Sequence, residues 1–205
     1  KEHKNNYSAI FISLFSSLAT FILSIFVWYS MDFSSSEFQF LEEQSWINNF
    51  IKFKLGVDGI SILFIVLTTL ITPICIVSCI NSVKDRIKEF LIAILVLETF
   101  MIGVFCSLDL VVFYLFFEAG LIPMFLIIGV WGGPRRVYSA FKFFLFTLLG
   151  SVLMLAAIIA IYWITGTTDV TQIYEVKIPK EYQNLLWLAF FSSFAVKTPM
   201  WPVHT

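Results

Sequence analysis

Long apolar runs separated by short polar stretches dominate this chain. Because an α-helix rises about 1.5 Å per residue and the hydrocarbon core of a bilayer is about 30 Å thick, roughly 20 apolar residues make one crossing. Six runs approach or exceed that length, at residues 8–30, 59–80, 90–106, 110–130, 138–164 and 185–205. The pattern predicts an all-α integral membrane protein, a polytopic helix bundle with about six transmembrane segments.

The polar stretches between these runs predict the connections. Only Ser107, Leu108 and Asp109 separate the third and fourth runs, so we expect these two helices to be antiparallel neighbours. Residues 31–57 alternate apolar and polar side chains in EFQFLEE and FIKFKLGV, which favours a short extramembrane β-hairpin. A plain solvated loop explains them equally well. Asp58, in GVDGIS, is placed to cap the next helix.

Composition and charge support a membrane location and narrow the function. Hydrophobic residues make up 59% of the chain and charged residues 13%, with a mean hydropathy of +0.90, whereas a soluble domain carries about 25% charged residues. A net charge of −1, with the basic residues spread over loops, excludes a nucleic-acid-binding face. The three cysteines lack partners at metal-ligand spacing, so we expect them to pack and no metal to be bound.

The basic residues also predict the orientation of the spans. If six spans alternate in direction, one side of the membrane carries more lysine and arginine than the other, and that side should face the cytoplasm or the mitochondrial matrix. The richer side carries Lys1, Lys4, Lys84, Arg86, Lys88, Arg135 and Arg136, against Lys52, Lys54, Lys177 and Lys180.

Two charged residues within apolar runs are the principal candidates for function. They are Glu118 in LFFEAGLIPMF and Lys197 in FAVKTPMWPVHT. An ionised side chain at the bilayer centre costs about 2.5–3.5 kcal/mol on insertion scales, so it usually has a role. A carboxylate and an ammonium stabilise each other when close, and separating them frees a proton to move. We therefore predict a proton relay; a buried ion pair that only fixes helix registry is the alternative.

Further residues extend the predicted relay. Lys142 lies about one turn inside the fifth run, where it either serves the relay or extends to the headgroups. His204 is a second candidate station, because histidine exchanges protons near neutral pH. Glu98, at the centre of the third run, is a possible member. Pro199 and Pro202 should break the last helix, and broken helices at membrane depth line ion sites in transporters.

Motifs for other chemistries are missing. The chain contains no GxGxxG, GxxxxGK[ST] or HExxH sequence and no convincing Ser, His and Asp set for a catalytic triad. We also expect no haem, flavin or iron–sulfur cluster to be held by this chain. The sequence therefore predicts ion or proton movement without a redox site of its own.

Four stretches of the chain resemble subunit M, or chain 4, of the proton-pumping NADH:quinone oxidoreductase, respiratory complex I. They are GVDGIS, VLETFMIGVFCSLDLVVFYLFFEAGLIPMFLIIGVWGG, KFFLFTLLGSVLML and FAVKTPMWPVHT. The likeness runs from about Leu55 to Thr205 and is looser before it. It implies an antiporter-like subunit of the membrane arm. On that family's pattern, Glu118, Lys142 and Lys197 resemble relay residues on three helices, and His204 falls in the break of the last.

The resemblance also implies partners and cofactors. The chain would work with the other membrane-arm subunits of complex I, including neighbouring antiporter-like subunits, in the bacterial or mitochondrial inner membrane. NADH, FMN, iron–sulfur clusters and quinone would bind other subunits, and quinone reduction there would drive proton transfer here. Multi-subunit sodium/proton antiporters and membrane-bound hydrogenases have similar chains and are the alternative. An assembly scaffold whose charges only lock helices is a third hypothesis.

A division of the chain follows from the same resemblance. We expect residues 1–89 to form N-terminal transmembrane helices with a polar extramembrane loop, and residues 90–205 to form the first antiporter-like repeat. That repeat is expected to be incomplete at its C-terminal end, because the family's second repeat is not in these 205 residues and both ends of the chain look cut. We therefore expect the piece not to pump protons alone.

Overall fold

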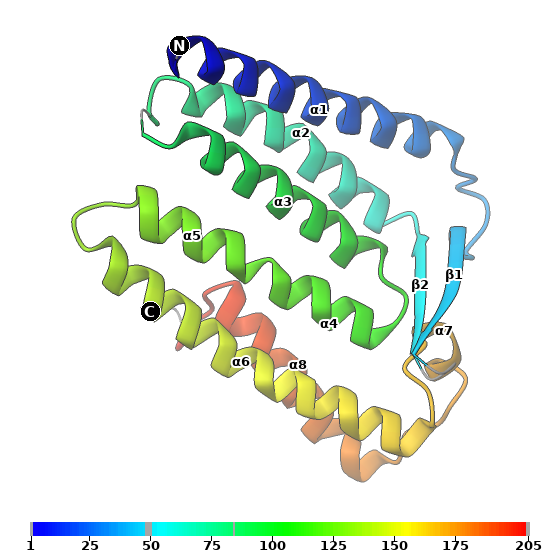
Figure 1. Ribbon diagram of the computed structural model, residues 1–205. Helices are drawn as coiled ribbons and strands as arrows, with labels where there is room; N and C mark the ends of the chain where they lie inside the picture. The colour runs from blue at the N-terminus through cyan, green and yellow to red at the C-terminus, as the bar shows by residue number, and fades with distance from the viewer. Residues whose placement is uncertain (1, 48–50, 84, 204–205) are drawn as a thin grey trace.

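The computed structural model describes residues 2–47, 51–83 and 85–203. In chain order its helices are α1 (Glu2–Ser30), α2 (Ser61–Cys79), α3 (Ile87–Cys106), α4 (Leu110–Ala119), α5 (Leu121–Trp131), α6 (Arg136–Thr165), α7 (Val170–Ile173) and α8 (Lys180–Lys197). Between α1 and α2, strands β1 (Gln39–Ile47) and β2 (Ile51–Val57) pair in antiparallel fashion. Figure 1 shows the long helices running side by side, with the hairpin and α7 together at one end.

Five helical segments of the described chain are long and apolar enough to cross a membrane. They are Asn6–Ser30, Ser61–Cys79, Ile87–Cys106, Leu110–Trp131 and Arg136–Thr165. These segments coincide with the first five predicted runs and confirm the prediction of a polytopic helix bundle. The sixth run forms α8, whose apolar part is shorter because Lys180, Glu181 and Lys197 occupy its two ends.

Packing divides the helices into two groups that meet at α3. Helices α1, α2 and α3 contact one another and form the N-terminal helix group. Helix α3 also contacts α4 and α5, while α6 packs against both α5 and α8. Gly150 allows α6 and α8 to approach closely, because a Cβ atom added there would lie 3.1 Å from Val196. The fold thus brings the C-terminal helix against α6, beside α4.

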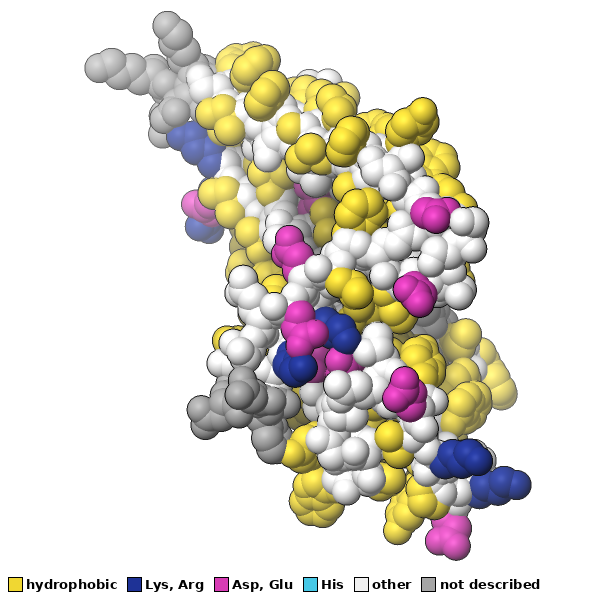
Figure 2. Space-filling model, turned by 90° about the vertical axis from the view of Figure 1, so that its right-hand side faces the viewer, with side chains coloured by type: hydrophobic (Ala, Val, Ile, Leu, Met, Phe, Trp, Pro, Cys, Tyr) yellow, Lys and Arg dark blue, Asp and Glu magenta, His cyan; other side chains and the backbone are white. Residues whose placement is uncertain are grey.

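The polar segment after α1 forms a β-hairpin, which decides between the two predictions for residues 31–57. Lys52 on β2 pairs with Glu43 on β1 at 2.6 Å. Asp58 follows the hairpin, and its Oδ1 accepts a hydrogen bond from the N–H of Ser61, the first residue of α2, at 2.6 Å. Ile60 occupies the position directly before α2, so Asp58 binds the helix start from two residues further out. Figure 2 views this end of the molecule and shows acidic and basic side chains gathered on it, with hydrophobic side chains around them.

Hydrogen bonds join the connections at this end. Leu108, in the α3–α4 loop, donates its N–H to the carbonyl of Lys54 at 3.0 Å and accepts from the N–H of Val170 at 2.9 Å. The Nζ of Lys54 lies 2.7 Å from Oδ2 of Asp169 and 2.8 Å from Oγ1 of Thr171. The hairpin, the α3–α4 loop and the α6–α7 loop therefore form one extramembrane unit, which we call the loop junction.

The Lys54–Asp169 pair should make the stability of the loop junction depend on pH. Burial on its own would raise the pKa of the Asp169 carboxyl, but hydrogen bonds from Lys54 and Thr171 outweigh burial and hold the pKa below its ordinary value of 3.8. An acid whose pKa is lowered by folding stabilises the folded state above its ordinary pKa. That contribution is lost as the pH falls through the lowered value.

We therefore expect Asp169→Asn to destabilise the protein by about 1.5–3 kcal/mol at neutral pH, the range for a hydrogen bond to a charged group. The difference from the wild type should start to shrink below about pH 4, where the unfolded chain takes up a proton, and should vanish below the lowered pKa of Asp169 in the folded protein. Thermal unfolding of the detergent-solubilised protein measures both effects. Glu175→Gln changes an exposed acid in the same connection and serves as the control; equal melting of the two variants would contradict the assignment.

Candidate functional site

The predicted fourth span is interrupted next to Glu118. Helix α4 ends at Ala119, and α5 begins at Leu121 after a single intervening residue. Pro123 has no N–H, so the carbonyl of Ala119 lacks the donor that an unbroken helix would supply four residues later. The hydropathy pattern predicts one continuous helix here, although the glycine and proline of EAGLIPM are a signal for the interruption.

Lys197 is the last residue of α8, and its side chain reaches the interruption. Its Nζ donates a hydrogen bond to the carbonyl of Phe117 at 2.9 Å and lies 3.3 Å from the centroid of the Phe117 ring. In an unbroken helix that carbonyl would accept from the N–H of Leu121. The aromatic face attracts a cation, and the partial negative charge at the end of α4 adds to the attraction. Although the residue as a whole is exposed, its charged end is therefore bound.

Glu118 lies near Lys197 but is not joined to it. The Glu118 carboxyl interacts electrostatically with Lys197. However, Glu118 and Lys197 do not form one of the direct ion pairs found among the described residues. Oε1 of Glu118 is buried and meets no hydrogen-bond partner in the described part of the chain. One turn earlier on α4, Tyr114 interacts with the hydroxyl of Ser151 on α6. The predicted acid and base are thus neighbours held apart.

Lys142 and Lys197 line the same cavity, of about 340 Å³, between α6 and the end of α8. Thr147 and Pro199 also line it. Because a water molecule occupies about 30 Å³ in the liquid, a cavity of this size has room for several. The structure therefore brings two of the predicted relay residues to one cavity, with Glu118 near one of them.

The other predicted site residues are placed differently. Helix α8 ends two residues before Pro199, which agrees with the expectation that Pro199 and Pro202 prevent a continuous helix. His204 lies outside the described residues. Glu98 is buried on α3 beside Thr72 of α2, so the structure does not bring it to the Lys197 cavity.

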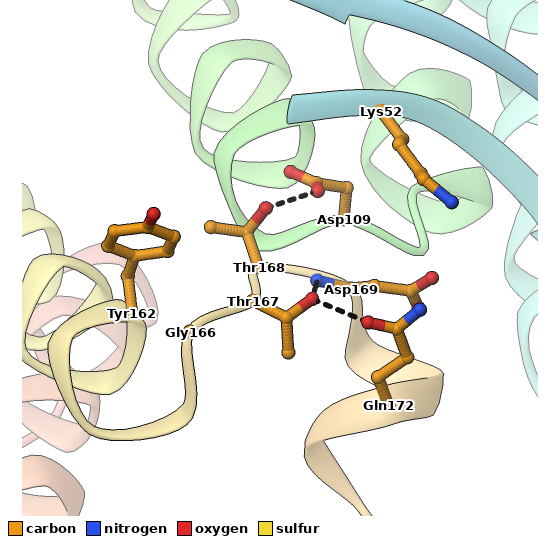
Figure 3. Close-up of a pocket in the computed structure, with 8 residues that line it drawn as sticks. All are labelled: Lys52, Asp109, Tyr162, Gly166, Thr167, Thr168, Asp169 and Gln172. Carbon is orange, nitrogen blue, oxygen red and sulfur yellow. Dashed lines mark hydrogen bonds between the residues drawn. The ribbon is translucent and has the colours of Figure 1, made fainter. Parts of the chain in front are cut away.

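A polar pocket at the loop junction was not foreseen from the sequence. Its volume is about 310 Å³, and it is lined by Lys52, Asp109, Tyr162, Gly166, Thr167, Thr168, Asp169 and Gln172 (Figure 3). Thr168 donates to Oδ2 of Asp109 at 2.5 Å, and Thr167 donates to the side-chain oxygen of Gln172 at 2.8 Å. Oδ1 of Asp109 caps α4 by accepting from the N–H of Val111. These polar groups therefore hold the loops to one another; the aspartates of SLDL and GTTDVT were their only signal.

Two family models together match nearly the whole chain. The model described as NADH-ubiquinone oxidoreductase chain 4, amino terminus, matches residues 4–104. The model described as NADH:quinone oxidoreductase/Mrp antiporter, TM, matches residues 107–205. The change from one match to the other falls at the α3–α4 loop.

Relatives and a solved structure agree with these matches. The chain is 52% identical over 97% of its length to NADH-quinone oxidoreductase subunit M of Rhodobacter capsulatus, and 50% identical over 94% to NADH-ubiquinone oxidoreductase chain 4 of Marchantia polymorpha. It spans 41% and 39% of these two relatives, about two fifths of their length.

A chain in the structure of respiratory complex I from Thermus thermophilus with bound NADH superposes with a TM-score of 0.84 at 28% identity. The superposition covers 94% of this chain and 40% of that one. Fold, family models and relatives point to the same group of proteins. The chain belongs to the family of subunit M, or chain 4, of NADH:quinone oxidoreductase.

Proposed function

We propose that this chain transfers protons within the membrane as part of an antiporter-like subunit of NADH:quinone oxidoreductase. One observation carries the proposal: the ammonium of Lys197 is bound to the Phe117 carbonyl at a helix interruption, near the carboxyl of Glu118, whose Oε1 meets no hydrogen-bond partner among the described residues. A charged group held at membrane depth is costly, and such residues usually mark ion or proton pathways. The lysine has two alternative partners, the carbonyl with its ring and the carboxylate.

Movement between these partners is the proposed transfer step. An opposite charge stabilises the charged form of an amine, so Lys197 would hold its proton more firmly when paired with Glu118 than when apart from it. The cavity shared with Lys142 supplies a place for the proton to go when Lys197 releases it. The reverse movement would reload the lysine. A cycle of pairing and separation thus moves one proton without any covalent change in the chain.

The chain would carry out no redox reaction of its own. NADH, FMN, the iron–sulfur clusters and quinone would bind other subunits, and quinone reduction there would drive the change at Lys197. The partners would be the other membrane-arm subunits, in the inner membrane of a bacterium or a mitochondrion. Within the chain, residues 1–89 would serve as the N-terminal helices and residues 90–205 as the first antiporter-like repeat.

The experiment that tests this function measures what drives proton movement. Membranes containing the full-length subunit should take up protons when NADH is oxidised, and the subunit should purify together with NADH:quinone oxidoreductase activity. Sodium-dependent proton flux without NADH oxidation would instead assign the chain to a sodium/proton antiporter. Purification with a hydrogen-oxidising complex would assign it to a membrane-bound hydrogenase, and either result would reject the proposal.

A further inference from the structure

The N-terminal helix group contains a buried carboxyl, that of Glu98, which the proposed relay through Glu118 and Lys197 does not use. Glu98 lies on α3 with only 5% of its surface exposed. Its Oε1 is buried and meets no hydrogen-bond partner in the described part of the chain, and its carboxyl group interacts with the hydroxyl of Thr72 on α2. Eight residues separate Glu98 from the end of α3 at Cys106, so it lies about 12 Å inside the helix.

Hydroxyl side chains extend from Glu98 towards α1. Thr69 is fully buried one turn before Thr72 on α2, and its Oγ1 lies 2.8 Å from Oγ of Ser24 on α1. We call Ser24, Thr69, Thr72 and Glu98 the Glu98 cluster, which joins the three N-terminal helices. Hydroxyl groups are sufficient to hydrogen-bond helices together in a membrane. The carboxyl is therefore the member whose presence needs a separate explanation.

The hydroxyl protons near Glu98 are directed to backbone carbonyls. Thr72 Oγ1 donates to the carbonyl of Thr68 at 3.0 Å, and Thr69 Oγ1 donates to that of Ile65 at 3.0 Å. A hydroxyl has one proton to donate, while its oxygen can still accept. In this arrangement the Thr72 oxygen can accept a hydrogen bond from a protonated Glu98. The contact therefore fits the neutral carboxylic acid.

The helix segments beside α3 offer no cation to an ionised Glu98. Residues 7–30, 61–79 and 110–131, which include the parts of α1, α2, α4 and α5 beside α3, contain no lysine, arginine or histidine. The titratable groups within these segments are Tyr7, Tyr29, Cys75, Cys79, Tyr114 and Glu118. The elements packed against α3 also carry Glu2, His3 and Lys4 in the first turn of α1, and Lys52 and Lys54 on β2. Both lysines on β2 are already paired with acids at the hairpin end. A buried, unpaired carboxylate relieves its desolvation by taking up a proton.

We propose that Glu98 is a neutral carboxylic acid at neutral pH, and that the Glu98 cluster is a second proton-holding site, open to modification by apolar carbodiimides. Such reagents dissolve in the bilayer and would approach α3 from the side on which Ile92 and Val96 are exposed. The site is distinct from Glu118 and Lys197. Its resting protonation does not depend on the proposed pumping function, so either can be correct without the other.

The modification uses the acid proton and therefore reports it. The carboxyl oxygen of Glu98 bonds to the central carbon of the carbodiimide, and the carboxyl proton passes to one of the reagent's nitrogens, giving an O-acylisourea. Migration of the acyl group from oxygen to nitrogen then forms a stable N-acylurea. All atoms of the reagent are retained, and nothing is oxidised or reduced. An ionised carboxylate lacks the proton that the first step consumes.

The first test treats membranes containing the intact complex with dicyclohexylcarbodiimide at neutral pH and locates the adduct by mass spectrometry. We expect an adduct on Glu98 and none on Glu118, which has Lys197 beside it. Because the unmodified protein is used, the result needs no variant to fold. In Glu98→Gln the label should be lost completely, whereas Glu89→Gln, which changes an exposed acid at the start of the same helix, should keep it.

The second test measures the acid directly by infrared spectroscopy. The wild type minus Glu98→Gln difference spectrum should contain the carbonyl band of a protonated carboxylic acid at neutral pH. Thr72→Val removes the acceptor and should shift that band to higher frequency, a response that a purely structural carboxylate would not give. Absence of a Glu98-dependent acid band overturns the proposal, as does an adduct on Glu118 with none on Glu98. A band without an adduct supports the proton-holding site and rejects its reactivity.

Discussion

Replacement of Lys197 by methionine, in the full-length subunit of the assembled complex, is expected to abolish NADH-driven proton uptake. In the wild type, Nζ of Lys197 lies 2.9 Å from the Phe117 carbonyl oxygen. Methionine retains an unbranched apolar side chain but has no ammonium to bind that carbonyl and no proton to carry. We expect the initial rate, followed with a pH-sensitive dye in inverted vesicles, to fall at least roughly tenfold, or about 1.4 kcal/mol in the barrier. Full uptake by an assembled variant complex would contradict the proposed relay.

Two further variants separate the role of the proton from the role of the charge. Arginine stays protonated in proteins, so Lys197→Arg retains a cation that cannot release its proton and should also lose proton uptake. Lys180→Met removes a lysine from the opposite end of α8, away from the residues that line the cavity. That control should retain the wild-type rate. Normal uptake by Lys197→Arg would mean that a fixed positive charge is enough.

Hydropathy was sufficient to predict the membrane-spanning helices. Lipid offers no hydrogen bonds, so the apolar runs have to become helices whatever their detailed sequence, and the first five runs do so. Local chemistry also predicted that Asp58 acts at the start of α2, because such a contact needs only the neighbouring backbone. The sequence does not decide between a β-hairpin and a loop for residues 31–57, since alternation over a few residues fits a loop as well as a strand.

Contacts between distant segments could not be predicted in the same way. The Lys54–Asp169 pair joins residues 115 positions apart, and the bond from Lys197 to the Phe117 carbonyl spans 80 positions. Both depend on how α6 and α8 return to the earlier helices, which hydropathy does not specify. The sequence singled out Glu118 and Lys197 as candidates, but it did not indicate that a carbonyl and an aromatic ring hold the lysine.

The two buried carboxyls illustrate how environment assigns different roles to the same side chain. Glu118 and Glu98 both lie eight residues, about 12 Å, from the α3–α4 loop on antiparallel helices. Lys197 approaches Glu118 and places a positively charged group near it. Glu98 has hydroxyl groups and apolar side chains instead. A charged acid beside a movable cation suits transfer, whereas a neutral acid among hydroxyls suits storage of a proton.

Replacement of Glu118 by glutamine is expected to have the second large effect. Glutamine has nearly the same shape, so the complex should assemble and still oxidise NADH with an artificial electron acceptor. The amide cannot ionise, however, and Lys197 would lose the charged partner to which it is proposed to move. We expect NADH-driven proton uptake to fall at least roughly tenfold, as for Lys197→Met. The ratio of protons taken up to NADH oxidised measures the loss independently of the amount of complex.

Matched substitutions then distinguish transfer from scaffolding. Glu118→Asp keeps the acid on a shorter side chain and should retain part of the proton uptake, while Glu89→Gln, an exposed acid paired with Arg86, should be unaffected. Glu118→Leu tests the scaffold hypothesis, because replacing a buried charge that serves only structure by an apolar residue is often neutral or stabilising. A Glu118→Leu complex that is stable and pumps normally would show that the carboxylate only holds helices in place. Loss of pumping in a stable complex, the result we expect, would leave proton transfer as its role.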